Sequence, residues 1–241
     1  MIESHPSESQ GKTSSQLKTI SSQSSQLLSQ LAILAIAGQV ILFASAWLLP
    51  LVSEYSLMGD NISELVLGRY GFIQTAAFVI SGLGTLGLAF AIRQLTKGTW
   101  GSFVGPLLVG MYGLGAILSA IFPTDRIDAA TDVWAQSTTG MIHSLVALIS
   151  FPGMVIGMFL LTRTFGLLPA WRSIMRASVF FPAGSLGLLV VQGEGPLVGL
   201  LQRLLVAVIS GWIILVALRV RKIAGSTELE PAKEKRRKET V

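Results

Sequence analysis

The chain has 241 residues, of which 51% are hydrophobic and only 13% are charged, and it contains no cysteine. Soluble domains carry about a quarter charged residues, so a soluble core of this size cannot hide so much apolar surface and the bilayer has to act as solvent. The absence of cysteine excludes disulfides, thiol catalysis and cysteine-ligated metals. The net charge of +5 collects in the C-terminal tail and in alternate loops, which is typical of membrane topology and not of a nucleic-acid-binding surface.

The two ends of the chain are polar. Residues 1–30 are rich in serine and glutamine and bury little apolar surface, which predicts a disordered cytoplasmic tail. A helical extension of the first span from about Ser21 is the alternative. Residues 221–241 form a basic cytoplasmic tail, interpreted either as a solvated topology anchor or as a grip on anionic lipid headgroups. Residues 31–220 between them form the predicted transmembrane domain.

Six apolar runs, each close to the roughly 20 residues that cross a bilayer, predict an all-α, polytopic bundle of six transmembrane helices. They are Leu31–Leu51, Tyr70–Leu95, Phe103–Phe122, Thr138–Leu161, Ile174–Val191 and Leu197–Val220. A further short helix is predicted in the first outer loop, where Asn61 and Glu64 have the spacing of a capping box and Gly68 can end the helix.

Basic residues gather in every second connection. Arg93 and Lys97 flank the second connection and Arg163 and Arg172 the fourth, whereas the other three connections are dominated by acidic residues. The positive-inside rule therefore places both termini in the cytoplasm and three loops outside. We expect a multi-pass protein of the plasma membrane whose main partners are membrane lipids.

Glycines recur inside the apolar runs. Gly82–Gly87 matches the pattern G-x-G-x-x-G but lacks the preceding strand that a dinucleotide fingerprint requires, so no cofactor is predicted from it. Small residues at such positions let helices approach closely. The same holds for the pairs Gly101/Gly105 and Gly153/Gly157, and the sequence leaves open whether these faces pack within one chain or form a homo-oligomer.

Two ionisable side chains fall inside the spans, where a charge needs an explanation. His143 lies five residues into the fourth run, and Arg203 lies at the start of the sixth. At 1.5 Å per residue, both are about 7–10 Å below the outer surface. Glu64 enters from the first outer loop, and Asp125 follows the third span.

These polar residues have two interpretations. One is a structural ion-pair network in which Glu64 or Glu194 neutralises Arg203. The other is a polar pocket, open to the outside, that binds a lipid headgroup or a small ligand. The candidate ligand-binding residues are Ser63, Glu64, Arg69, Asp125, His143 and Arg203.

A metal site is not predicted. Asp125, Asp128 and Asp132 have helical spacing and offer the oxygen ligands that divalent cations prefer. Such a run is more often a solvated helix face, and zinc sites usually need more nitrogen or sulfur ligands than this chain supplies near the membrane.

Three segments together resemble a known family. They hold the Ser-Glu-Leu turn of Asp60–Gln74, the Pro-x-Asp and Gly-x-x-His patterns of Gly115–His143, and the arginine of Gly199–Trp212. Over about residues 33–220 the chain resembles the DUF998 family of prokaryotic membrane proteins, which implies a six-helix bundle without an assigned activity. A fainter similarity to Frag1/DRAM/Sfk1-like membrane proteins, some of which are tied to lipid remodelling, favours a lipid as the partner.

Three functions follow from these features, and the first is favoured. In the first, the protein binds an outer-leaflet lipid headgroup or a small ligand and catalyses no reaction. In the second, it is an enzyme that modifies lipid, with His143 as a general base held by Asp125 or Glu64. The third is a small-solute transporter, for which the inner half supplies little polar material beyond Gln39, Ser81 and Thr85. The chain lacks the several histidines of ceramidase-like hydrolases, which counts against a metal-dependent hydrolase.

Overall fold

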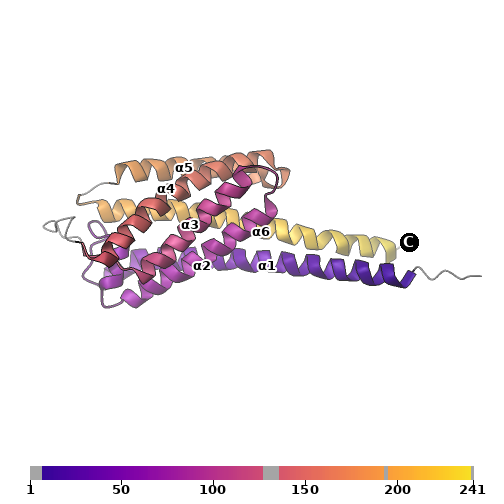
Figure 1. Cartoon of the computed structure of the whole chain (residues 1–241), viewed down its shortest axis with the longest axis horizontal. Coiled ribbons are helices and arrows are strands. Elements are labelled where there is room, and N and C mark those ends of the chain that lie inside the picture. Colours follow the sequence, from indigo (N-terminus) through magenta and orange to yellow (C-terminus); the bar gives the residue numbers. More distant parts are fainter. Residues whose placement is uncertain (1–6, 127–135, 193–194, 240–241) are drawn as a thin grey trace, which may run out of the picture.

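The computed structural model describes residues 7–126, 136–192 and 195–239, with side chains described between 22 and 226 (Figure 1). Every regular element in these ranges is a helix. The elements are α1 (Ser7–Leu48), η1 (Leu49–Val52), η2 (Ile62–Leu67), α2 (Gly71–Leu95), α3 (Gly101–Ile121), α4 (Thr138–Leu167), η4 (Pro169–Trp171), α5 (Arg172–Val191) and α6 (Val198–Glu239).

Six helical segments are long and apolar enough to cross a membrane, which confirms the predicted polytopic bundle. They are Ser22–Val52, Gly71–Leu95, Gly101–Ile121, Thr138–Leu167, Pro169–Val191 and Val198–Ser226. The fourth continues beyond the predicted Leu161 and stops just before Pro169, which disfavours helical backbone at the residue preceding it. The predicted short helix in the first outer loop is also present, as the 3₁₀ helix η2.

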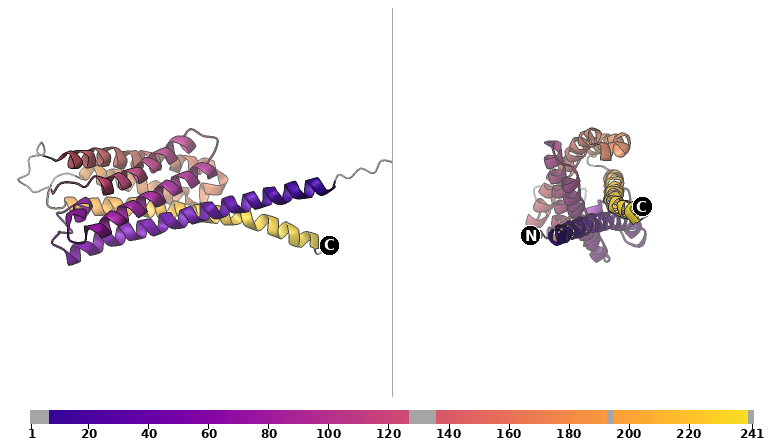
Figure 2. Two further views of the ribbon diagram at one scale, coloured as in Figure 1. Left: turned by 60° about the horizontal axis from the view of Figure 1, so that its bottom comes forward. Right: turned by 90° about the vertical axis from the view of Figure 1, so that its right-hand side faces the viewer.

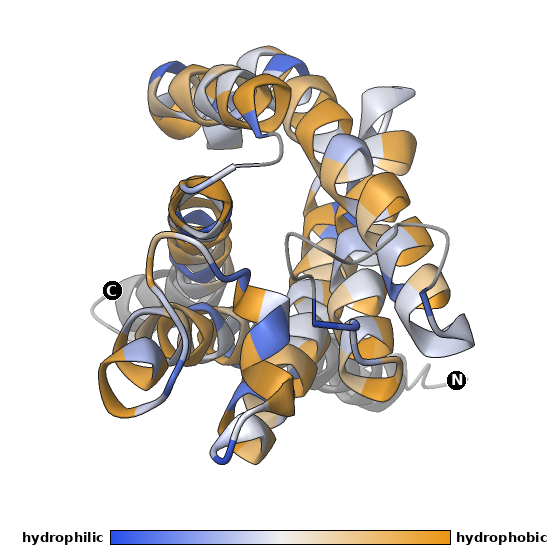
Figure 3. Cartoon of the chain, turned by 90° about the vertical axis from the view of Figure 1, so that its left-hand side faces the viewer, coloured by the Kyte–Doolittle hydropathy of each residue, from blue (hydrophilic) through white to orange (hydrophobic). Residues whose placement is uncertain are grey.

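The six helices form a closed ring. Each long helix packs against the next one in the chain, and α6 packs against α1 (Figure 1). The loop that holds η2 lies at one end of this ring, named here the η2 end. Viewed from that end, much of the helical ribbon is coloured as hydrophobic (Figure 3), and large apolar side chains such as Phe72, Leu148 and Phe180 are exposed. Such an outer surface suits contact with lipid.

At the opposite end, α1 and α6 continue beyond the other helices and diverge (Figure 2). The first helix therefore extends out of the membrane-spanning part. It begins at Ser7, earlier in the chain than the extension considered from about Ser21. The division of the chain into two tails and a membrane domain at residues 30 and 220 stays a prediction.

Near this opposite end, aromatic side chains fill the interior of the ring. The rings of Phe165 and Trp171 stack with their centroids 4.5 Å apart. The ring of Trp212 also stacks with that of Phe165, and these two centroids are 6.4 Å apart. The indole nitrogen of Trp212 donates to Ser178 Oγ at 2.8 Å. These contacts join α4, η4, α5 and α6.

The middle of the ring is held by a polar side chain and by close backbone contact. Gln39 Nε2 donates to Ser81 Oγ at 2.9 Å and to Thr85 Oγ1 at 3.2 Å, and Gln39 Oε1 accepts from Ser210 at 2.8 Å. Interhelical hydrogen bonds of this kind hold transmembrane helices together where the hydrophobic effect offers no force between them. The three polar residues considered for a transport path therefore bond one another.

Glycines let α2 and α3 touch through their backbones. A Cβ atom at Gly82 would lie 2.5 Å from the carbonyl oxygen of Gly113, and one at Gly113 would lie 2.9 Å from that of Gly82. The predicted packing role of these glycines is realised within the chain. A homo-oligomer through the glycine-rich helix faces stays a prediction.

Candidate functional site

The first outer loop folds around η2 as its capping signals predict. Glu64 Oε1 accepts from the backbone N–H of Asn61 at 2.9 Å and from its side-chain amide at 3.1 Å. Gly68 closes the helix, with its N–H directed to the carbonyl of Leu65. Glu64 is only 2% exposed, so this loop dips among the helix ends and is more than a solvated connector.

Arg203 on α6 fastens this loop to the bundle. Its Nε donates to the carbonyl oxygen of Ala46 at 2.9 Å. Its Nη1 donates to the carbonyl oxygens of Leu57 at 3.1 Å, Asp60 at 2.6 Å and Gly199 at 3.0 Å. Arg203 is 1% exposed, so one buried cation joins the end of α1, the loop and the start of α6.

The carbonyl of Ala46 needs such a donor because of Pro50. In an α-helix this oxygen would accept from the N–H four residues later, and proline has none. A carbonyl left without a partner in an apolar environment is costly. Arg203 supplies the missing donor across the helix interface.

The partners of Arg203 differ from those expected for an ion-pair network. Its hydrogen bonds to described residues run to backbone carbonyls, and the carboxylates of Asp60 and Glu64 add electrostatic attraction from nearby. The other predicted partner, Glu194, lies outside the described residues. The charge is thus held chiefly by peptide dipoles.

Two further backbone contacts attach the loop to α6. The N–H of Ile62 donates to Gln202 Oε1 at 2.6 Å, and the N–H of Leu200 donates to the carbonyl of Met58 at 3.1 Å. The position of Ile62 and its neighbour Ser63 therefore depends on the first turns of α6.

Asp125 and Ser137 fix the start of α4. Asp125 accepts from the N–H and from the hydroxyl of Ser137, both at 2.7 Å. Ser137 in turn caps α4 by accepting from the N–H of Gly140 at 3.1 Å. A side chain at Gly140 would overlap the Asp125 carboxylate, which explains why a glycine stands one turn before His143.

His143 is oriented by the end of α3. Its Nδ1 lies 2.9 Å from the carbonyl oxygen of Phe122. A carbonyl can only accept, so Nδ1 carries the proton, and in the neutral ring Nε2 is left as an acceptor. The predicted carboxylate partners bond elsewhere among the described residues, Asp125 with Ser137 and Glu64 with Asn61, and the Nδ1 partner is a carbonyl instead.

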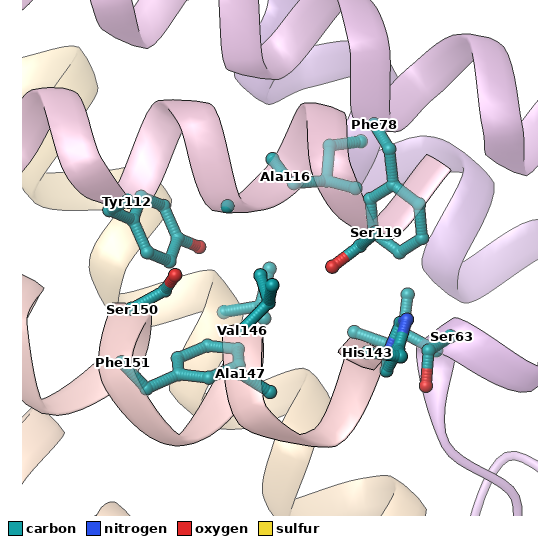
Figure 4. A pocket seen from close by; sticks show the side chains of 14 residues that line it. Ser63, Phe78, Tyr112, Ala116, Ser119, His143, Val146, Ala147, Ser150 and Phe151 are labelled. Carbon is teal, nitrogen blue, oxygen red and sulfur yellow. The ribbon is translucent and has the colours of Figure 1, made fainter. Parts of the chain in front are cut away.

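His143 faces a cavity at the η2 end of the ring (Figure 4). The cavity has a volume of about 60 Å³ and is lined by η2 and by α1, α2, α3, α4 and α6. The lining residues are Leu42, Ile62, Ser63, Phe78, Tyr112, Gly115, Ala116, Ser119, His143, Val146, Ala147, Ser150, Phe151 and Val206.

Polar side chains lie at both ends of this cavity, with apolar walls between. One end of the cavity, next to Ser63, holds Ser119 and His143. The other end holds Tyr112 and Ser150 (Figure 4). His143 and Ser150 are seven residues apart on α4, which is about 10 Å along the helix axis. The hydroxyls of Tyr112, Ser119 and Ser150 make no hydrogen bond to another described residue.

The structure places the six predicted site residues in different roles. Ser63 and His143 line the cavity. Glu64 and Arg203 hold the loop above it, and Asp125 holds the start of α4, so these three support its walls. Arg69 is exposed, with its guanidinium 5.6 Å from the ring of Tyr70, and does not line the cavity.

Three hydroxyl residues that the sequence did not predict as site residues also line the cavity: Tyr112, Ser119 and Ser150. A signal was available, because Tyr112 and Ser119 are seven residues apart on one helix, as are His143 and Ser150 on the next. That spacing returns a side chain to the same helix face after two turns. Using it required knowing that α3 and α4 turn these faces toward each other.

The described residues offer no evident metal site, since no three histidine, aspartate or glutamate side chains among them lie close enough to share an ion. Two of the three aspartates considered for a cation, Asp128 and Asp132, lie outside the described residues.

Comparison with protein families gave one informative match. The family model described as "Protein of unknown function (DUF998)" matches residues 35–219, which supports the resemblance seen in the sequence and does not bear out the fainter one to Frag1/DRAM/Sfk1-like proteins. Comparison with curated proteins and with solved structures gave no match.

Proposed function

The chain belongs to the DUF998 family, which is described as a family of unknown function, and we propose that it binds a lipid of the outer leaflet, part of which enters the cavity beneath η2. One observation carries this proposal. The cavity has mostly apolar walls and receives His143, whose ring is already fixed through Nδ1 and offers Nε2 to a ligand. Apolar pockets with a few placed polar groups are typical of small-molecule sites.

The distribution of basic residues indicates on which side of the membrane the cavity lies. Arg93, Lys97, Arg163 and Arg172 lie in connections at the end opposite η2. By the positive-inside rule that end faces the cytoplasm, together with both termini. The cavity then lies at the depth of the outer leaflet of the plasma membrane.

The size of the cavity limits what can enter it. A volume of about 60 Å³ holds a few water molecules, whereas sites for whole drug-sized ligands measure about 300–1,000 Å³. A complete phospholipid headgroup does not fit. We therefore infer that a small part of a lipid enters while the rest lies against the apolar outer surface.

The same contacts favour binding over the two alternatives. The enzyme considered above has His143 held by Asp125 or Glu64, whereas here Nδ1 of His143 donates to a peptide carbonyl instead. A transporter needs a polar path through the remaining half, where Gln39 is bonded to its neighbours and Phe165 stacks on Trp171.

Native mass spectrometry of the purified protein tests the proposal. We expect lipid adducts on the wild type and a loss of about tenfold or more in their abundance for Ala116→Leu or Ala147→Leu, which fill the cavity. Ala76→Leu, on the exposed face of α2, is the matched control and should keep the adducts. Retention of the same adducts by both cavity-filling variants, with unchanged thermal stability, would overturn the proposal.

A further inference from the structure

The cavity lining carries no full charge. None of the described lining residues is an aspartate, glutamate, lysine or arginine. Arg203 and Asp125, which belong to the same end of the ring, do not line the cavity. Arg203 donates through Nε and Nη1 to backbone carbonyls, and Asp125 accepts from Ser137. A phosphate, carboxylate or ammonium group inside the cavity would therefore lack a counter-ion, and an unpaired buried charge is strongly unfavourable.

The lining does offer hydrogen bonds to a neutral group. His143 Nε2 is an acceptor while Nδ1 donates to Phe122. Ser119 lies beside it, and its hydroxyl can donate or accept. One alcohol group satisfies both, because its O–H can donate to the imidazole while its oxygen accepts from Ser119.

Resting on the proposed function, we propose that the cavity selects the hydroxyl group of an uncharged lipid and rejects charged headgroups. A hydroxymethyl group is small enough for a cavity of about 60 Å³. The hydroxyls of Tyr112 and Ser150 at the far end can receive a second polar group or a water molecule. The recognition step involves only hydrogen bonds and burial of apolar surface.

The absence of cysteine from the chain makes a direct test simple. Ala147→Cys places a single thiol in the cavity wall, and Leu148→Cys places one on the adjacent lipid-facing surface. Each variant is reconstituted in phosphatidylcholine nanodiscs, and the rate of labelling by a small thiosulfonate reagent is measured. The nanodiscs contain added dioleoylglycerol, oleyl alcohol, dioleoyl phosphatidic acid or no further lipid.

We expect dioleoylglycerol, oleyl alcohol or both to slow labelling of Ala147→Cys about threefold or more, a clear shift of a binding equilibrium, with no effect on Leu148→Cys. Protection by dioleoylglycerol alone assigns a two-chain lipid, and protection by oleyl alcohol shows that one chain with a hydroxyl suffices. Equal protection by phosphatidic acid would overturn the selection for neutral lipid while leaving lipid binding intact. Absence of protection by every added lipid would overturn the selection of a neutral hydroxyl group, whereas the native mass spectrometry described above tests lipid binding itself.

Two substitutions of His143 separate its ligand-binding nitrogen from its structural one. His143→Asn keeps a donor near the position of Nδ1, for the Phe122 carbonyl, and removes Nε2. His143→Gln reaches the position of Nε2 and gives up the Nδ1 donor. In the Ala147→Cys background we expect protection by the neutral lipid to disappear in His143→Asn and to persist in His143→Gln. Full protection in His143→Asn would show that Nε2 does not recognise the hydroxyl.

Discussion

Arg203 Nε donates to the carbonyl oxygen of Ala46 at 2.9 Å, across 157 positions of sequence. The bond joins a donor near the start of the last helix to an acceptor near the end of the first. Since Pro50 removes the helical donor for that carbonyl, a local irregularity in α1 is compensated by a side chain on α6. The contact lies between the two helices that close the ring, and the same guanidinium also bonds to the η2 loop.

Replacement of Arg203 should therefore destabilise the protein even where charge is conserved. Arg203→Lys keeps the cation but cannot direct an Nε and an Nη donor to separate carbonyls. We expect both Arg203→Lys and Arg203→Met to lower the free energy of unfolding by about 2–4 kcal/mol, because buried carbonyls lose their donors. Thermal or denaturant unfolding in micelles measures this loss.

Pro50→Ala provides the control for this explanation. Alanine restores an N–H that can bond Ala46 within α1. In the Arg203→Met background, Pro50→Ala should recover about 1 kcal/mol, the usual value of one hydrogen bond, and a double-mutant cycle measures the coupling. Strictly additive effects of the two substitutions would contradict the proposed relationship between Arg203 and Pro50.

The sequence predicted the elements of the fold because their causes are local. Apolar runs of membrane length specified the six helices, and the capping spacing of Asn61 and Glu64 with Gly68 behind them specified the helix η2. Depth along the helices also placed Arg203 and His143 correctly at the η2 end. These predictions need only composition and the rise per residue.

The partners of these residues could not be predicted in the same way. A buried arginine suggested a carboxylate, whereas the acceptors are carbonyls made available by Pro50 and by the path of the loop. Likewise, the grouping of Tyr112 and Ser119 with His143 depends on which faces of α3 and α4 meet. Such pairings are properties of the tertiary arrangement and leave only weak signals in one sequence.

Two glycine substitutions should have opposite effects on stability. Gly140→Ala introduces a methyl group where the Asp125 carboxylate lies, so we expect a loss of about 1–3 kcal/mol from overpacking at the start of α4. Gly187→Ala in α5 is the matched control, because no atom lies within 4 Å of the added Cβ. It should be neutral or stabilising by up to about 1 kcal/mol through helix propensity.

Melting temperatures of the two variants in the same detergent test this difference. If Gly140→Ala proves as stable as the wild type, the Asp125–Ser137 arrangement cannot be what holds the start of α4. In that case the position of His143 would have to depend on Phe122 alone.

Tyr55, in the first outer loop, should make stability sensitive to alkaline pH. Burial raises the pKa of its phenol above the ordinary value of 10.0, although the nearby guanidinium of Arg126, 5.2 Å from the ring, lowers it in part. A group whose pKa is higher in the folded state stabilises the fold below its unfolded pKa and loses that contribution as the pH rises. The free energy of unfolding should therefore fall as the pH rises above about 10.

Tyr55→Phe should remove this part of the alkaline destabilisation, since phenylalanine does not ionise. Unfolding of the wild type and of Tyr55→Phe, followed from about pH 8 to about pH 11, should show parallel behaviour at the lower end and a steeper decline of the wild type at the upper end. Other groups also titrate in this range, so the difference between the two proteins is the quantity that matters. Parallel curves throughout would mean that Arg126 lowers the pKa of the Tyr55 phenol by as much as burial raises it.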